Sequence, residues 1–200
     1  MKTLHMPQGS VEWHQARLGV ITASEADALV SPTGKVRTGE GVKTYLYRKL
    51  AEKAVGYCPE MAESYAMDQG KLLETVALPW FEFETGKKVQ RVGFVTTDDG
   101  ACGCSPDGLL EDGSGVEVKA PQPPNHIKYL LEGVVPDQYV VQCQFSLWVT
   151  QAPYWTFVSY SMRLPALVVR VERDEKIQAA ITEAVSQFST TLTACMAKIA

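Results

Sequence analysis

The sequence predicts a single α/β domain over residues 1–200, with a central mixed β-sheet flanked by helices. Apolar residues recur at helical spacing in the first half of the chain and again near its end, whereas the segments between them alternate with a period of two. No repeat, low-complexity tract or linker interrupts these patterns. A chain of 22.0 kDa buries about 70% of its open surface on folding, which is enough for one core.

Capping residues and helix breakers, in addition to periodicity, mark the helical segments. Residues 22–25 (Thr-Ala-Ser-Glu) predict a helix start, because a hydroxyl cap and an acidic first turn favour one, and residues 31–34 (Ser-Pro-Thr-Gly) predict a break. Gly86 predicts a helix end, with a kink or interruption at Pro79 before it. The four longer helices are expected over residues 41–55, 60–85, 137–149 and 174–198.

Strand-like segments occupy the middle of the chain and the stretch before its last helix. Asp112-Gly113 is a strong hairpin signal, so we expect the segments on either side of residues 111–115 to pair. A run of prolines after residue 120 predicts the end of the second arm. Strands are expected over residues 88–95, 109–110, 116–119, 154–160 and 167–172.

Composition excludes several classes of protein. The charge is mixed and the apolar fraction is 46%, which argues against disorder, and no apolar run approaches the roughly 20 residues of a membrane span. Residues 1–7 lack the apolar stretch of a signal peptide, so we expect a cytoplasmic protein with no membrane partner. Five scattered cysteines predict buried thiols, although the close pair Cys102 and Cys104 leaves open a zinc-binding interaction module.

The formal net charge of −4 hides an uneven distribution. Residues 1–53 carry 8 basic and 5 acidic side chains, residues 54–119 carry 5 and 12, and residues 120–200 carry 6 of each. The basic residues between positions 35 and 53 are therefore candidates for phosphate contact, alongside the alternative of a solvated helix face.

One constellation of residues carries chemistry. Residues 105–108 (Ser-Pro-Asp-Gly) precede the predicted hairpin, and residues 117–119 (Glu-Val-Lys) lie on its second arm. Pairing brings Asp107 beside that arm, and Glu117 and Lys119 project from one face of it while the intervening valine enters the core. Two carboxylates beside an ammonium suit Mg²⁺ and phosphodiester hydrolysis, in the pattern of a PD-(D/E)xK nuclease with a restriction-endonuclease-like core. An ordinary hairpin with a surface Glu–Lys pair is the alternative.

Further blocks of sequence extend this match, in order, from about residue 11 to the last helix. Together they resemble the phage lambda exonuclease family, the YqaJ-type viral recombinases, within the PD-(D/E)xK nuclease superfamily. The matching blocks are Glu12-Trp13-His14 with 17–25 (Arg-Leu-Gly-Val-Ile-Thr-Ala-Ser-Glu), Gly70-Lys71 with Glu74, 81–83 (Phe-Glu-Phe), 104–109 (Cys-Ser-Pro-Asp-Gly-Leu), 115–119 (Gly-Val-Glu-Val-Lys), Tyr139 with Gln142, Gln144, Ser146 and 148–150 (Trp-Val-Thr), and 171–176 (Val-Glu-Arg-Asp-Glu-Lys).

The resemblance implies roles for the acidic cluster. Asp107 and Glu117 are expected to bind the metal, with the backbone carbonyl of Val118 as a further ligand. Lys119 is expected to activate the attacking water, and Glu74 is expected to add an acidic side chain from a helix facing the hairpin.

The resemblance also implies a site for the 5′-terminal phosphate of DNA. Arg17, Ser24, Ser105 and Gln142 match the residues that grip this phosphate, and Tyr139, one helical turn before Gln142, is expected to line the pocket. A guanidinium fork and hydroxyl or amide donors are chemically suited to phosphate. Taken singly, each has an ordinary alternative: a surface ion pair for Arg17, a helix cap for Ser24 and a solvated helix residue for Gln142.

The implied activity is that of an alkaline-type 5′-to-3′ double-stranded DNA exonuclease. Such an enzyme uses Mg²⁺, with Mn²⁺ as a substitute, to degrade one strand of linear duplex with a 5′-phosphorylated end to mononucleotides. A ring-shaped homotrimer and a single-strand annealing protein that receives the remaining 3′ strand are the implied partners. Alternatives are a restriction-like endonuclease or junction resolvase of the same fold, and a DNA-end-binding module without catalysis.

Overall fold

The computed structural model describes the backbone of residues 1–56 and 65–199 and the side chains of residues 1–56 and 75–199. Its strands are β1 (Lys2–Leu4), β2 (Ile21–Thr22), β3 (Val89–Gln90), β4 (Phe94–Thr96), β5 (Cys102–Cys104), β6 (Gly108–Leu110), β7 (Gly115–Lys119), β8 (Trp155–Ser159) and β9 (Leu167–Val171). Its helices are α1 (Val11–Arg17), the 3₁₀ helix η1 (Ala23–Ala28), α2 (Glu40–Val55), α3 (Tyr65–Thr85), α4 (Pro123–Glu132), α5 (Asp137–Thr150) and α6 (Glu175–Ile199). The predicted mixed α/β class is confirmed.

The strands form two mixed sheets instead of one. The first has the order β1-β4-β5-β2 and the second β3-β6-β7-β8-β9, with parallel pairing only at β2–β5 and β7–β8 within the described residues. The predicted strand over residues 88–95 is divided, because β3 pairs with β6 in one sheet and β4 pairs with β1 in the other. Gly93 lies between β3 and β4, where the chain passes from one sheet to the other, and an added Cβ there would stand 2.4 Å from the carbonyl oxygen of Met6.

The hairpin, the long helices and the last two strands lie close to where the sequence predicts them. Gly86 ends α3 with φ +69°, and α3 continues through Pro79. The predicted helix start at residues 22–25 becomes the 3₁₀ helix η1. The expected helix over residues 60–85 is described from Tyr65 onward, and its residues 60–64 lie outside the described residues.

Helix α4 has no counterpart among the predicted elements. The prolines at positions 123 and 124 begin this helix, because proline is tolerated in the first turn, where its missing N–H would have no partner in the helix. Gly133 ends it with φ +67°. The run of prolines therefore marks both the end of β7 and the start of a helix.

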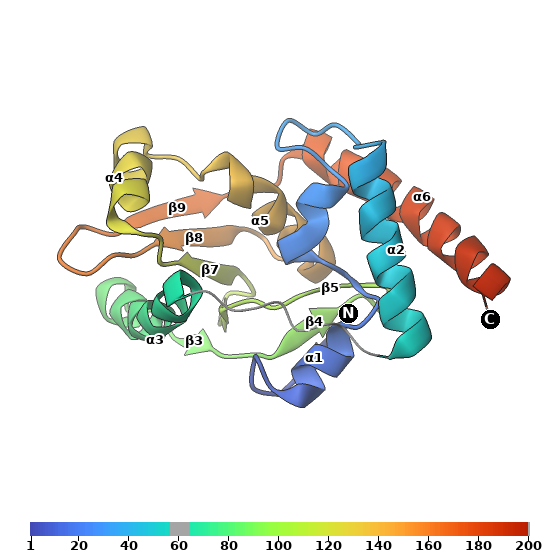
Figure 1. Cartoon of the computed structure of the whole chain (residues 1–200). Helices are drawn as coiled ribbons and strands as arrows, with labels where there is room; N and C mark the ends of the chain where they lie inside the picture. Colours follow the sequence, from blue (N-terminus) through green and yellow to red (C-terminus); the bar gives the residue numbers. More distant parts are fainter. Residues whose placement is uncertain (57–64, 200) are drawn as a thin grey trace.

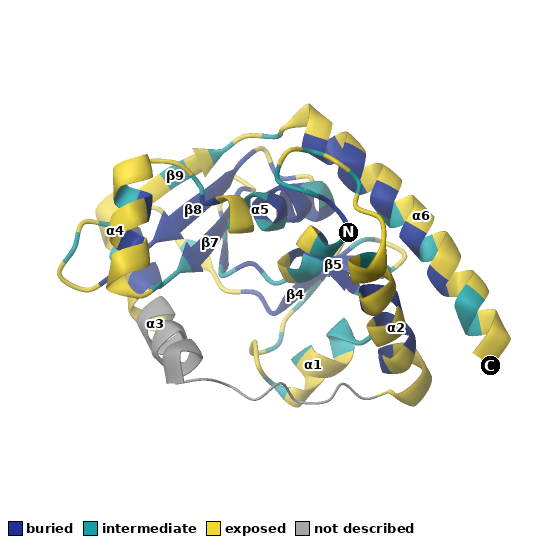
Figure 2. Ribbon diagram, turned by 45° about the horizontal axis from the view of Figure 1, so that its top comes forward, coloured by how far each residue is buried: buried dark blue, intermediate teal, exposed yellow. Residues whose placement is uncertain are grey.

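Helix α5 forms the centre of the molecule. It packs against η1, α6 and strands of both sheets, and buried residues surround it, as Figure 2 shows in dark blue. Helix α6 instead presents one buried stripe, and the rings of Phe188 and Tyr45 meet across its contact with α2 at 5.1 Å. Figure 1 shows α2 and α6 together at one end of the molecule and α3 and α4 at the other. No helix in the described part of the chain is long and apolar enough to cross a membrane.

Candidate active site

The β6–β7 hairpin carries the acidic cluster. Its turn is closed by the N–H of Leu110, which donates to the carbonyl of Ser114 (2.8 Å), and Gly113 adopts φ +80° within it. Gly108 pairs with Val116, so the residue before β6 faces the second half of β7. The turn chemistry of the sequence thus sets the register that brings the carboxylates together.

Asp107, Glu117 and Lys119 converge at the open end of this hairpin. The carboxylate of Asp107 accepts a hydrogen bond from the backbone N–H of Val118 at 2.7 Å, one residue from Glu117. The ammonium of Lys119 lies 2.6 Å from Oε1 of Glu117. Val118 is fully buried among apolar residues, so the predicted alternation of faces along β7 is the observed one.

Glu117 is a buried carboxylate, with only 3% of the residue exposed. Gln142, on α5, donates its amide N–H to Oε1 of Glu117 at 2.5 Å. Burial raises the pKa of the Cys104 and Cys143 thiols, and the negative charge of Glu117 adds to the effect on both. The site therefore combines low solvent access with negative potential, which favours a bound cation.

Tyr139 lies on the Lys119 side of this cluster. The Nζ atom of Lys119 stands 5.5 Å from the centre of the Tyr139 ring, within the range of a cation–π contact. The ring itself packs between Tyr129 of α4 and Phe157 of β8. The described contacts of Tyr139 are thus with the acidic cluster, whereas the sequence grouped it with the phosphate residues.

Glu74 belongs to α3, but its side chain lies outside the described residues. Its predicted place beside the hairpin stays a prediction.

A second cluster gathers around Arg17 at the end of α1. Its guanidinium donates to the hydroxyl of Ser105 at 3.0 Å and to the hydroxyl of Ser24 at 3.2 Å. Three of the four residues predicted to bind phosphate therefore meet in space, although they come from three separate segments. The fourth, Gln142, contacts Glu117 instead, and the step from Ser105 to Asp107 joins the two clusters directly along the chain.

Trp13 supports this second cluster and is absent from the predicted site. It lies four residues before Arg17 on α1, and the guanidinium stands 4.2 Å from its ring centre. Its indole N–H lies 2.9 Å from the hydroxyl of Ser105 and 3.0 Å from the carbonyl of Gly93. The signal that could have found it is the i, i+4 spacing of an aromatic and an arginine on one helix face.

A buried ionic network lies next to Arg17. Lys49 of α2, whose side chain is only 3% exposed, contacts Glu25 and Glu52 at 2.9 Å each. Arg48 adds a contact to Glu25 at 2.7 Å. Lys49 is consequently neither an exposed candidate for phosphate contact nor part of a solvated helix face, which corrects both expectations for this one residue of positions 35–53.

The described cysteines are free thiols. Cys102, Cys104 and Cys143 are buried, as predicted, whereas Cys195 is only half-buried and Cys58 lies outside the described residues. Burial raises the pKa of Cys102 to about 12, which is the behaviour of a structural thiol.

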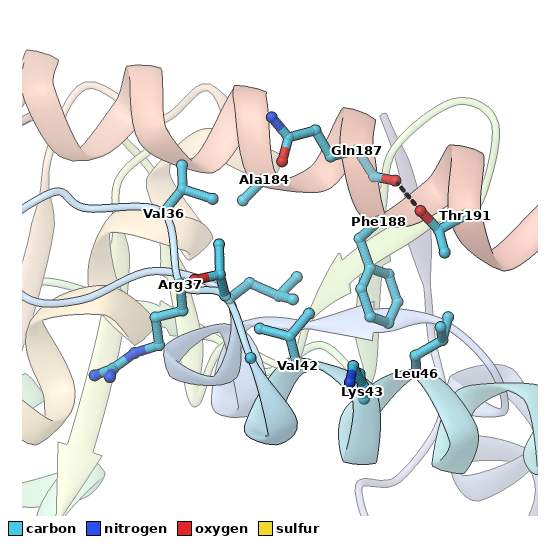
Figure 3. Close-up of a pocket in the computed structure, with 12 residues that line it drawn as sticks. Val36, Arg37, Val42, Lys43, Leu46, Ala184, Gln187, Phe188 and Thr191 are labelled. Atoms are coloured by element: carbon cyan, nitrogen blue, oxygen red, sulfur yellow. Dashed lines mark hydrogen bonds between the residues drawn. The ribbon is translucent and has the colours of Figure 1, made fainter.

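A groove of about 260 Å³ opens elsewhere, between α2, α6 and the loop before α2. Figure 3 shows the side chains of Val42, Leu46 and Phe188 facing one another in it. None of the described site residues lines this groove, so the groove is separate from the candidate active site.

The donor set at the hairpin fits a hard divalent cation. No group of three or more His, Cys, Asp or Glu side chains meets a metal-binding arrangement among the described residues, from which the side chain of Glu74 is missing. Two carboxylates and a backbone carbonyl nevertheless match Mg²⁺, which takes a few protein oxygens and fills its other positions with water and substrate phosphate. Asp107, Glu117 and Val118 offer these oxygens.

Comparison with known proteins places the chain in a family. The model of the YqaJ-like viral recombinase domain matches residues 12–153. The crystal structure of an alkaline exonuclease (LHK-Exo) from Laribacter hongkongensis is 30% identical, with a TM-score of 0.85 over 95% of this chain and 96% of that one. The same enzyme in complex with dAMP gives 31% identity and a TM-score of 0.84, with the same coverage.

Two further relatives are more distant or shorter. A phage-related exonuclease from Haemophilus somnus 129PT shares the fold at 14% identity, with a TM-score of 0.69 over 90% of this chain and 96% of that one. The Escherichia coli K12 protein ExoD is 32% identical over an alignment of 78 positions that covers 36% of this chain and 90% of that protein. Because the family model spans most of the chain and the fold agrees over nearly all of it, the protein belongs to the YqaJ-like viral recombinase family.

Proposed function

We propose that this protein is a Mg²⁺-dependent exodeoxyribonuclease that degrades one strand of linear double-stranded DNA from its 5′ end. Its family and its resemblance to an alkaline exonuclease support a nuclease. The observation that carries the finer proposal is that the two clusters adjoin. Arg17 contacts the hydroxyls of Ser105 and Ser24, and Asp107 of the acidic cluster follows Ser105 by two residues in the chain. A phosphate gripped by the first cluster lies next to the second.

The phosphate cluster recognises the DNA end. Arg17 binds the 5′-terminal phosphate, because its planar fork of donors matches phosphate oxygens. The hydroxyl oxygens of Ser24 and Ser105 accept hydrogen bonds from Arg17, and their hydroxyl hydrogens are donated to the same phosphate. Trp13 holds the guanidinium in place through its ring.

The acidic cluster performs hydrolysis. Asp107, Glu117 and the carbonyl of Val118 hold Mg²⁺, with Mn²⁺ as a substitute. When bound, the cation lowers the pKa of water and neutralises charge on the phosphodiester. Lys119 orients the attacking water and stabilises the developing negative charge. Gln142 fixes Glu117 by donating to its Oε1.

The products and partners follow from the chemistry at the end. Cleavage of the phosphodiester that joins the terminal nucleotide to the second one releases a mononucleotide that keeps the gripped phosphate, and the relative solved with dAMP supports this product class. The 3′ strand that remains is a substrate for a single-strand annealing protein. A homotrimeric ring keeps the enzyme on its DNA. Light scattering tests the trimer, which predicts a mass in solution of three times the 22.0 kDa of one chain.

The test is digestion of duplexes that differ only at their ends. Linear DNA with a 5′ phosphate should be degraded to mononucleotides in Mg²⁺, more slowly with a 5′ hydroxyl, and not at all in EDTA. Closed circles should survive, and a label at the 5′ terminus should be released before one at the 3′ terminus. Equal cutting of circles would instead support an endonuclease of the same fold, and binding of ends without cleavage would support a non-catalytic module.

A further inference from the structure

The charge of Arg17 is left open for a ligand by the way its neighbours are paired. The guanidinium contacts the hydroxyls of Ser24 and Ser105 and the ring of Trp13. The carboxylate of Glu25, one residue after Ser24, is close enough that its charge acts on the pKa of Arg17: burial lowers that pKa, and Glu25 is the largest influence raising it. Glu25 is thus the natural competitor of phosphate for Arg17.

Glu25 is instead held by other donors. Its two oxygens are approached by Arg48 Nη2 (2.7 Å), Lys49 Nζ (2.9 Å), Thr22 Oγ1 (2.9 Å) and Tyr45 OH (3.3 Å). Burial by itself would raise the pKa of Glu25, but Lys49 and then Arg48 outweigh it and lower the pKa below its ordinary value. Glu25 is therefore an ionised carboxylate that is fully occupied away from Arg17.

Lys49 also reaches the other end of the segment that carries Arg17. It lies 2.9 Å from Glu52, whose Oε2 accepts the backbone N–H of Gly19 at 2.8 Å. Gly19 has φ +67°, and an added Cβ there would stand 2.2 Å from the side chain of Lys53, so the turn after Arg17 is held tightly against α2. The buried ammonium of Lys49 thus contacts Glu25, one residue after Ser24, and through Glu52 it also helps to hold Gly19, two residues after Arg17.

Counted over the described residues, Arg17, Arg48 and Lys49 against Glu25 and Glu52, the charges of this network leave one positive charge in excess. Arg48 and Lys49 make ion pairs with Glu25 and Glu52, and the same two carboxylates act on the pKa of the neighbouring Arg17. Without Lys49 the sum is zero, and among the described ion pairs Glu25 and Glu52 are left to share Arg48. Because an uncompensated buried charge is costly, these carboxylates then attract a further cation. Arg17 is such a cation, because both carboxylates oppose the lowering of its pKa by burial.

We propose that Lys49 is a positioning residue for the terminal-phosphate site: by neutralising Glu25 and Glu52 it keeps Arg17 free to bind the 5′ phosphate. This inference rests on the proposed function and adds to it a residue that contacts neither DNA nor metal. Its signature is selective, because it acts on recognition of the phosphate and not on hydrolysis.

The experiment compares 5′-phosphoryl with 5′-hydroxyl duplexes in two ways: the ratio of kcat/KM in Mg²⁺, and the ratio of equilibrium binding constants in EDTA. Lys49→Met, which keeps the length of the side chain, should lower both ratios about tenfold, the order expected for a lost charge-assisted contact. Adding Glu25→Gln to it restores the excess charge and should bring the ratios back. Lys128→Met, which removes a lysine from an exposed pair with Glu132, should leave them unchanged.

Glu25→Gln alone keeps the test informative if Lys49→Met does not fold. It leaves Lys49 paired with Glu52 and removes the competing carboxylate, so its ratios should equal or exceed those of the wild type. A Lys49→Met protein that folds and keeps both ratios contradicts the inference, as does a Glu25→Gln protein that lowers them. A wild type that digests no DNA contradicts the proposed function alone, because the binding ratios need no hydrolysis.

Discussion

Lys119 lies between the carboxylate of Glu117 on β7 and the aromatic ring of Tyr139 on α5. Its ammonium contacts Glu117 at 2.6 Å and lies over the ring of Tyr139, so its position is set from both β7 and α5. It is about a quarter exposed, whereas Glu117 is nearly inaccessible. That difference suits the proposed roles, in which Lys119 meets water and Glu117 binds the cation.

Lys119→Met should therefore lower kcat by a factor on the order of 10² to 10⁴, the usual contribution of a proton-transferring side chain. Binding of a 5′-phosphorylated duplex in EDTA should remain, because the described contacts of Arg17 do not involve Lys119. Single-turnover digestion measures the first effect and fluorescence anisotropy the second. Undiminished turnover would remove Lys119 from the mechanism.

At the scale of elements, α4 supports the end of β7 that carries the lysine. His126 of α4 is fully buried, and its ring nitrogens lie 2.7 Å from the hydroxyl of Ser159 and 2.9 Å from the carbonyl of Pro165. Because a carbonyl only accepts, Nε2 donates to Pro165. Ser159 pairs in register with Lys119 across β8 and β7, so this one ring joins α4 to the strand beside the site.

His126→Ala should lower the free energy of unfolding by about 2–4 kcal/mol, because it leaves a cavity and removes a partner from the buried hydroxyl of Ser159 and from the carbonyl of Pro165. Urea denaturation followed by circular dichroism measures the loss. Asn125→Ala, at an exposed position of the same helix, should change stability by less than about 0.5 kcal/mol. Equal effects of the two substitutions would mean that α4 is not anchored through His126.

For the whole molecule, the acidic balance of the chain has a consequence for stability. The pKa of Asp112 is held well below its ordinary value by hydrogen bonds from Ser114 and Tyr154, and that of Glu25 is lowered by Lys49 and Arg48 against the opposing effect of burial. A carboxyl group whose pKa is lower in the folded state binds fewer protons there than in the unfolded state. The stabilisation it contributes is present above its ordinary value and is lost as the pH falls below it.

The free energy of unfolding should accordingly fall as the pH drops below about 4.5, the ordinary value for Glu25, and further below 3.8, that for Asp112. Urea midpoints at a series of pH values from about 6 to 3 measure this. Asp112→Asn, which cannot ionise, should show a smaller fall over the same range. A variant whose midpoint falls as steeply as that of the wild type would show that Asp112 does not contribute.

Local pattern was enough to predict much of the fold. Hydrophobic spacing and turn residues placed the long helices and the β6–β7 hairpin, because these elements depend on contacts between residues close in the chain. The strand over residues 88–95 was predicted as one piece and is two, since its division is made by pairing partners far away in sequence. Helix α4 was missed because the same prolines end a strand and begin a helix.

What the sequence by itself determined is the hairpin with Asp107, Glu117 and Lys119, because a turn signal and a period of two set which side chains share a face. Only the tertiary structure decided that Lys49 is buried between two carboxylates instead of meeting solvent. Likewise, only the fold joined Arg17 to hydroxyls from distant segments. The physical reason is that burial and pairing of a charge depend on which elements pack together, and no local periodicity carries that information.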